Sequence, residues 1–231
     1  MAIILKDSKS AAAPARPPAA PEEAGEGRRR RDPEATRRAI LDAAEEHFVA
    51  RGPDATSLAE IAQSAGVNKS LIHHHFGSKE ALWEEVQGRH FHQYFEAQRE
   101  MLMNAPSTEL LLRDSLIAFF RFLQADPKSV RFMSWTFCAA EPCKTEQEKA
   151  LFELGIARIR ESQGKGEIRT DVEPLFVIKA FLALAVNWFQ TRELTHSMID
   201  SPIGPNELDD LYLDTAVKIL LDGVRPLERR A

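Results

Sequence analysis

The sequence predicts an all-α protein with a small N-terminal unit of three helices and a larger helical region after it. Apolar residues recur at intervals of three and four along most of the chain, which is typical of amphipathic helices. Gly and Pro divide these segments from one another. No stretch alternates apolar and polar residues with a period of two for long enough to form a sheet.

The first helix is bounded by two local signals. Asp32-Pro33 places an N-cap residue before a proline at the first helical position. Gly52-Pro53 ends the helix, because Gly adopts the left-handed conformation and Pro cannot continue a helix.

Two shorter helices follow. Ser57 and Glu60 form a capping box, in which each side chain satisfies a backbone donor of the other residue, and Gly66 ends that helix. Asn68 caps the next helix, and Gly77 ends it. A turn of about four residues between two short helices is the spacing of a helix-turn-helix.

A fourth helix begins at Ser78-Lys79-Glu80, and the rest of the chain also reads as helical. The segments with helical periodicity are Trp83–Met103, Leu110–Leu123, Leu175–Phe189 and Glu207–Asp222. Breaks are expected at Pro106, at Asp126-Pro127, between 164 and 166 and between 201 and 205.

The segment from Thr56 to Lys79 carries the strongest functional signal. Its apolar residues form one face that packs the two short helices together: Ile61, Ala62, Ala65, Val67, Ile72 and Phe76. The opposite face of the second helix presents Lys69, Ser70, His73 and His74. No acidic residue lies between Glu60 and Glu80, although the chain has a net charge of −5. A local surface without acidic groups favours contact with phosphates.

This segment resembles the signature of the TetR family of transcriptional regulators. The matching positions are Ser57, Ile61, Ala62, Ala65, Gly66, Val67, Ile72, His75, Phe76, Ser78, Lys79 and Leu82, with Asn68 in place of a serine N-cap. Ser70 replaces the usual Gly of the signature, and His73 replaces a Tyr that touches the DNA backbone in the family.

The resemblance implies a sequence-specific DNA-binding regulator with a helical ligand-binding and dimerisation domain. Its partners would be double-stranded DNA with a palindromic operator, a second copy bound through the last two helices, and a small-molecule effector. The expected DNA-binding residues are Ser57, Asn68, Lys69, Ser70, Leu71, His73, His74 and Lys79. The first turn of the helix that enters the major groove, Lys69 to Leu71, is expected to read bases.

Three regions follow from these signals. Residues 1–31 form a tail too poor in apolar residues to fold, residues 32–82 form the helix-turn-helix domain, and residues 83–231 form the ligand-binding and dimerisation domain. Two interpretations of Arg28–Arg31, which end the tail, stay open: a solubilising charge run, or an arm that reaches phosphates or the minor groove.

The C-terminal region is rich in aromatic residues, most of which will be ordinary core. A minority are expected to line an apolar effector pocket between helices. The candidates are Phe119, Phe122, Trp135, Phe137, Phe181 and Trp188.

Other functions find little support in the sequence. It holds no Gly-rich phosphate loop, G-x-S-x-G elbow or H-E-x-x-H motif, so we expect no enzyme, no catalytic residue and no cofactor. His73, His74 and His75 point about 100° apart on a helix, so we expect no metal site. Cys138 and Cys143 are expected as reduced thiols, with redox or ligand sensing as the alternative.

The sequence also gives expectations for the cellular location of the protein and for its control by a ligand. No uninterrupted apolar run approaches the ~20 residues of a membrane span, and we expect a cytoplasmic, nucleoid-associated protein with no membrane partner. The favoured function is a repressor that an apolar or aromatic ligand releases from its operator. The alternative is a DNA-binding protein of the same fold without ligand control, such as a nucleoid or division factor. An apolar cavity in the C-terminal domain would favour the first.

Overall fold

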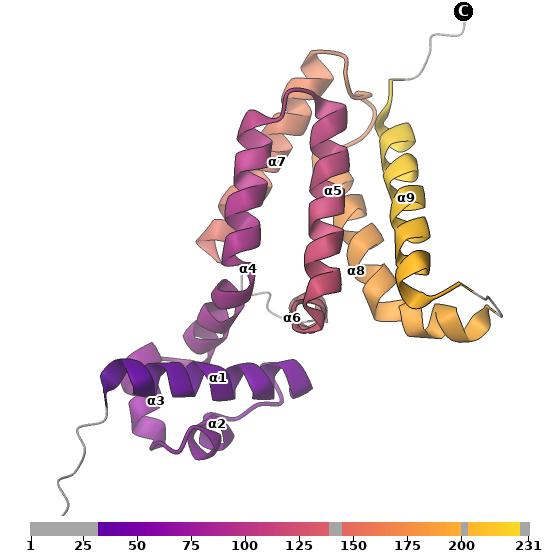
Figure 1. The fold of residues 1–231 in the computed structure, drawn as a ribbon. Coiled ribbons are helices and arrows are strands. Elements are labelled where there is room, and N and C mark those ends of the chain that lie inside the picture. Colours follow the sequence, from indigo (N-terminus) through magenta and orange to yellow (C-terminus); the bar gives the residue numbers. More distant parts are fainter. Residues whose placement is uncertain (1–31, 139–144, 200–202, 227–231) are drawn as a thin grey trace, which may run out of the picture. The chain divides into compact units, whose positions relative to one another are not determined.

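The computed structural model describes residues 32–138, 145–199 and 203–226. These ranges form nine α-helices and no strand (Figure 1). The all-α fold predicted from the sequence is confirmed. The helices are α1 (Pro33–Arg51), α2 (Leu58–Ser64), α3 (Lys69–Phe76), α4 (Lys79–Asn104), α5 (Thr108–Ala125), α6 (Pro127–Cys138), α7 (Glu146–Gly164), α8 (Pro174–Met198) and α9 (Pro205–Val224). The predicted tail with Arg28–Arg31 and the residue Cys143 lie outside the described residues.

The N-terminal helices share a hydrophobic core with the start of α4. Ile40 and Phe48 of α1, Ile61 of α2 and Ile72 of α3 are fully buried in it. Phe48 meets the ring of Trp83 edge-on at a centroid distance of 5.1 Å. Because Trp83 lies on α4, the helix that leaves the N-terminal unit is also part of its core.

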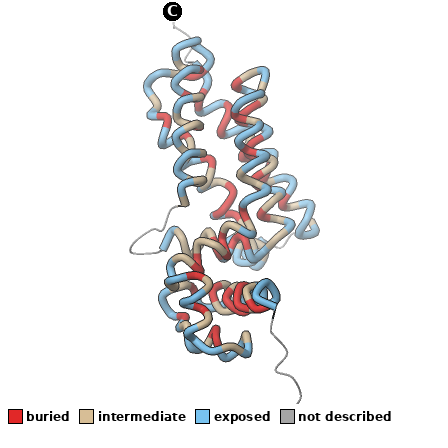
Figure 2. Tube along the Cα trace, turned by 90° about the vertical axis from the view of Figure 1, so that its left-hand side faces the viewer, coloured by how far each residue is buried: buried red, intermediate tan, exposed pale blue. Residues whose placement is uncertain are grey.

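A second core joins the C-terminal helices α5, α8 and α9 with parts of α4, α6 and α7. Figure 2 shows the buried residues concentrated along the faces that neighbouring helices share. Phe122 and Met133 contact both cores. Helix α4 runs without a break across the predicted domain boundary at 82/83, so the two regions share one helix.

Helix α6 attaches the C-terminal core to the end of α1. The indole Nε1 of Trp135 donates to the carbonyl of Val49 at 3.3 Å. The Trp135 ring also covers Gly52, where an added Cβ would lie 2.8 Å from the ring. Gly52 has a φ of +77°, so a residue without a side chain serves both the helix end and the close contact.

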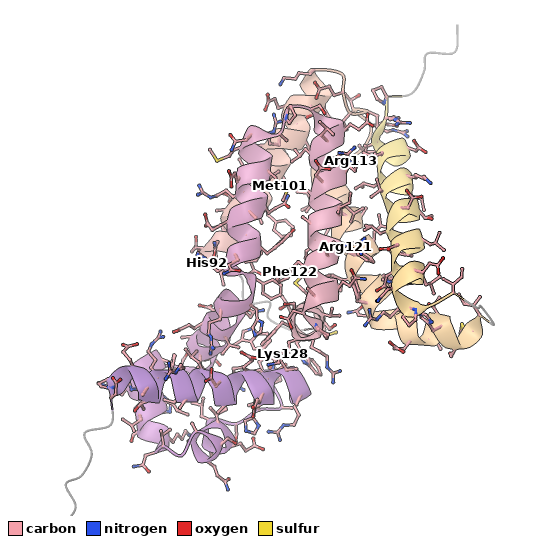
Figure 3. The ribbon with its side chains drawn as sticks, viewed as in Figure 1. His92, Met101, Arg113, Arg121, Phe122 and Lys128 are labelled. Atoms are coloured by element: carbon pink, nitrogen blue, oxygen red, sulfur yellow. The ribbon has the colours of Figure 1, made fainter. Side chains whose placement is uncertain are left out.

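An ionic cluster ties α1, α4 and α6 together beside this contact. His90 on α4 lies between two carboxylates, with its Nε2 3.1 Å from Glu45 and its Nδ1 3.1 Å from Asp126. Lys128, labelled in Figure 3, pairs with the same Glu45. Burial raises the pKa of Glu45, but the hydrogen bond from Lys128 and the charge of His90 outweigh it and lower the pKa.

Helix α8 is long and rich in apolar residues. By length and composition alone it could cross a membrane. The expectation of no membrane span rested on uninterrupted apolar runs, and Lys179 interrupts this one. Part of its apolar surface packs against α5, α7 and α9. Several large apolar residues on α8, after it and on α9 remain exposed: Leu175, Phe176, Leu194, Met198, Ile199, Leu211 and Ile219.

Candidate DNA-binding surface and effector cavity

The predicted capping box fixes the start of α2. The Ser57 hydroxyl accepts from the backbone N–H of Glu60 at 3.2 Å, and the Glu60 carboxylate accepts from the backbone N–H of Ser57 at 2.9 Å. This backbone hydrogen bond and the guanidinium of Arg51 lower the pKa of Glu60 to about 2. The acidic group at this helix start is therefore ionised, and it is paired with Arg51 at 2.7 Å.

Helix α3 presents the polar face that the sequence predicted. Lys69, Ser70, His73 and His74 are exposed, and Leu71 is half-buried. Ile72 and Phe76 face the core. The helix begins with its backbone N–H groups and a lysine side by side, an arrangement that attracts phosphate.

Asn68 occupies the N-cap position of α3, as expected, but its side chain makes no capping hydrogen bond. It is exposed. Its amide is therefore available to a partner instead of being used by the helix. We expect this amide to contact DNA.

Lys79 is placed differently from a free phosphate anchor. Its ammonium donates to the carbonyl of Pro53 at 2.8 Å and to the carbonyl of Thr56 at 3.3 Å. These bonds join the start of α4 to the loop between α1 and α2. A role for Lys79 in holding the loop is thus as well supported as direct contact with phosphate.

His73 is exposed, and its Nδ1 lies 3.0 Å from the carbonyl of Gly77, so its other nitrogen faces away from that bond.

The C-terminal domain contains a cavity of about 620 Å³ between α4, α5, α6, α7 and α8. This size is within the range of ligand pockets. Its walls are largely apolar and aromatic, and the residues that α4 and α5 contribute are Phe91, Tyr94, Phe95, Gln98, Leu102, Leu111, Leu112, Ser115 and Phe119.

Three of the six predicted pocket residues line this cavity: Phe119, Phe137 and Phe181. The other three do not. Phe122 lies against Phe91 and Tyr94 (Figure 3), and Trp135 covers the end of α1. Trp188 stacks on Tyr212 and donates to Asp209 at 2.7 Å. Each of these three rings has a partner on another helix that the sequence does not reveal.

Sequence reasoning also missed several cavity residues. It considered aromatic residues only, whereas α7 contributes Leu151 and Ile156, and Gln98, Ser115 and Thr136 supply polar groups. It also overlooked one aromatic residue of α7, Phe152. The helical periodicity around Gln98 placed it on a helix. Nothing local marks it as buried.

Among the residues that the structure describes, no His, Cys, Asp and Glu side chains gather as the ligands of a metal ion. Cys138 is exposed at the end of α6.

Comparison with known proteins identifies the N-terminal region. The model of the family "Bacterial regulatory proteins, tetR family" matches residues 40–86, which cover most of α1, all of α2 and α3, and the start of α4. Over these residues the chain is similar to the TetR family. The match includes the whole of α3, whose exposed polar face is therefore the candidate DNA-binding surface.

Two curated relatives extend the likeness. The "HTH-type transcriptional activator FasR" of Mycolicibacterium smegmatis is 35% identical over 114 residues, 49% of this chain and 52% of that protein. The chain thus spans about half of that relative. The "HTH-type transcriptional repressor AcnR" of Corynebacterium glutamicum is 25% identical over 195 residues, 80% of this chain and 95% of that protein.

Solved structures share the fold of this chain in the C-terminal helices as well as in the N-terminal ones. A transcriptional regulator from Streptomyces coelicolor has a TM-score of 0.61 at 22% identity, over 82% of this chain and 98% of that chain. FadR from Bacillus subtilis, solved with stearoyl-CoA, has a TM-score of 0.60 at 16% identity, over 82% of this chain and 100% of that chain. At these identities the likeness concerns the fold.

Replacement of Lys69 by alanine tests whether this residue of the exposed α3 face reads bases. We expect Lys69→Ala to weaken binding to the specific site by about 1–3 kcal/mol, because a lysine in the first turn of the helix can bond to guanine edges. Titrations of both proteins on the specific DNA site and on a duplex of scrambled sequence would measure this loss of affinity. Lys165→Ala, a lysine at the end of α7, is the charge-matched control. Equal binding of wild type and Lys69→Ala to the specific site would contradict the assignment.

Proposed function

We propose that this chain is a dimeric transcriptional repressor that a small apolar or aromatic effector releases from a palindromic operator in the cytoplasm. The cavity of about 620 Å³ carries the proposal, because a ligand-controlled regulator needs a place for its ligand. The alternative, a DNA-binding protein of the same fold without ligand control, gives no reason for such a cavity.

The exposed apolar residues of α8 and α9 support a dimer through these helices. Phe176, Leu194 and Met198 on α8 are 57–74% exposed, and Leu211 and Ile219 on α9 are 49% and 58% exposed. Exposed apolar residues gathered on adjacent helices indicate an interaction surface. To read successive major grooves, a two-fold dimer must hold its two copies of α3 about 34–36 Å apart.

The helices that line the cavity also hold the DNA-binding helices. On α4, Trp83 packs in the N-terminal core while Gln98 lines the cavity. On α6, Thr136 lines the cavity while Trp135 covers the end of α1. A ligand that favours one arrangement of α4 and α6 would therefore shift the position of α3. A coupling of about 1–3 kcal/mol would change DNA affinity about 5–150-fold.

Named relatives are consistent with repression and with ligand control. AcnR and the "HTH-type transcriptional repressor KstR2" of Rhodococcus jostii are repressors by name, whereas FasR is named an activator. The structure of FadR contains stearoyl-CoA. Repression thus has the larger support among these relatives, and an acyl chain is one apolar ligand that the fold accommodates.

Selection of bound DNA from a random pool, followed by a release screen of small molecules on the recovered site, tests the proposed function. We expect a palindromic site and at least one apolar compound that lowers DNA affinity. Linkage requires DNA to weaken the binding of that compound by the same factor. Recovery of a specific site that no compound releases, together with the absence of any ligand for the cavity, would favour the alternative without ligand control.

A variant that fills the cavity separates DNA binding from release. Ile156 is half-buried on α7 and lines the cavity. We expect Ile156→Trp to bind the operator like wild type and to lose most of the response to an effector, because the indole occupies ligand space. The control is Ala157→Trp, an exposed neighbour on the same helix that does not line the cavity. Equal release of the two variants would place the effector elsewhere.

A further inference from the structure

The polar groups inside the cavity are few, and their hydrogen bonds differ. Thr136 accepts from the Nε2 of Gln87 at 2.8 Å and donates to the carbonyl of Phe132 at 3.0 Å, so its hydroxyl is used within the protein. Ser115 accepts from the Nε2 of Gln98 at 2.7 Å. The remaining amide atom, the Oε1 of Gln98, is buried and has no hydrogen-bond partner among the described residues.

A buried carbonyl oxygen without a donor is costly, and a site built around such a group discriminates strongly between ligands that do and do not supply one. Gln98 is 7% exposed and lies in a wall that is otherwise mainly apolar. Its terminal torsion is soft, so the amide can turn its oxygen toward a ligand in the cavity. Gln98 is the one residue that both lines this cavity and has such a buried atom among the described side chains.

The charges at the cavity do not favour an ion inside it. The charged residues of the lining are two acids and two bases, Glu148, Lys149, Glu153 and Lys179. All except Glu148 are exposed, and Glu148 accepts from the backbone N–H of Thr145 at 2.9 Å. The buried polar groups are uncharged, and an ionised group placed among them would lack a partner.

We propose that the effector is an apolar molecule whose buried part is uncharged and carries one hydroxyl or N–H group, which donates to the Oε1 of Gln98. This inference rests on the proposed role of the cavity as the effector site and names the chemistry of its ligand. The volume of about 620 Å³ admits on the order of 20 groups of the ~30 Å³ that a water molecule occupies in the liquid. Gln98, whose oxygen turns to meet the donor in exchange for its bond to Ser115, determines specificity.

A pair of ligands that differ only in the donor tests the inference. Para-octylphenol carries a hydroxyl, and its methyl ether para-octylanisole has the same apolar body without a donor. Their affinities for the full-length protein would be measured by displacement of pyrene, a fluorescent apolar reporter without any hydrogen-bonding group. We expect wild type to prefer the phenol by on the order of 10- to 100-fold.

Variants assign this preference to the amide. Gln98→Met keeps the length of the side chain and removes both polar atoms, so the ratio of the two affinities should fall to about one while pyrene binding persists. Gln93→Met is the control. Gln93 is also on α4, but it is exposed and does not line the cavity. Gln93→Met should keep the wild-type ratio.

The outcomes separate the two proposals. Equal affinity of wild type for the phenol and the ether, or a ratio that survives in Gln98→Met, would overturn the inference and leave the effector site standing. Failure of pyrene and both ligands to bind wild type would contradict the effector site itself. Because the comparison of phenol and ether in wild type is decisive alone, the test does not depend on the folding of a variant.

Discussion

Replacement of Asp209 by leucine is expected to lower the free energy of unfolding by about 2–4 kcal/mol. Asp209 is 1% exposed on α9 and accepts three hydrogen bonds from other helices. The donors are the indole of Trp188 at 2.7 Å, the amide of Gln124 at 2.9 Å and the guanidinium of Arg192 at 3.2 Å. Leucine would leave these donors without their acceptor, and the Trp188 N–H would lose its bond in a buried position.

Urea unfolding at one fixed protein concentration would measure this loss, because the stability of a dimer depends on concentration. Asp210→Leu is the matched control. Asp210 is the next residue and pairs with Arg121 at 2.6 Å (Figure 3), but it is exposed, so its loss should cost less than about 1 kcal/mol. Equal losses in the two variants would show that the buried network does not stabilise the fold.

The position of Asp209 links this stability to function. Its three bonds join α9 to α5 and to two turns of α8. The proposed dimer interface lies on α8 and α9, so this carboxylate helps to fix the packing of the two helices that form it. We expect Asp209→Leu to weaken dimerisation as well as folding.

Local signals predicted the DNA-binding unit well because each acts over a few residues. Pro33, Gly52, Ser57 and Gly77 lie at the helix ends where the sequence placed them. These features depend on backbone conformation and on bonds between near neighbours, which a single sequence contains. The predicted breaks at Asp126-Pro127 and between 164 and 166 match the start of α6 and the end of α7, but the sequence did not predict the break between these two helices.

The cavity could not be predicted residue by residue, because its lining depends on packing between distant helices. Trp188 and Phe181 lie on the same helix, yet Phe181 lines the cavity and Trp188 bonds to Asp209, 21 residues away. Lys79 bonds to a carbonyl 26 residues earlier. Aromatic content indicated a large apolar interior, but it did not distinguish a ring at the cavity from a ring in the core.

Replacement of Gly52 by alanine should disturb the contact between α1 and α6. We expect it to destabilise the fold about as much as Asp209→Leu does. A positive φ costs a residue with a Cβ about 1–2 kcal/mol. The Cβ would also lie 2.8 Å from the Trp135 ring, and overpacking of this kind costs about 1–3 kcal/mol. We therefore expect Gly52→Ala to lower the free energy of unfolding by about 2–5 kcal/mol in urea titrations.

The control for the backbone is Gly166→Ala, because Gly166 has a similar φ of +74° and open space around its Cα. It should show only the conformational cost. The control for the ring is a double-mutant cycle with Trp135→Leu, which removes the clash. In that background Gly52→Ala should again cost about 1–2 kcal/mol. An unchanged cost with leucine would mean that the Trp135 contact does not carry the effect.

The same cycle tests whether α6 transmits the effector signal. Trp135 covers the end of α1 while its neighbour Thr136 lines the cavity, so one turn of α6 contacts both regions. If this turn carries the coupling, Trp135→Leu should bind the operator within about threefold of wild type but respond to the effector by a much smaller factor. Reciprocal titrations of DNA and effector measure the coupling free energy directly. A full response in Trp135→Leu would shift the coupling to α4, which reaches both regions through Trp83 and Gln98.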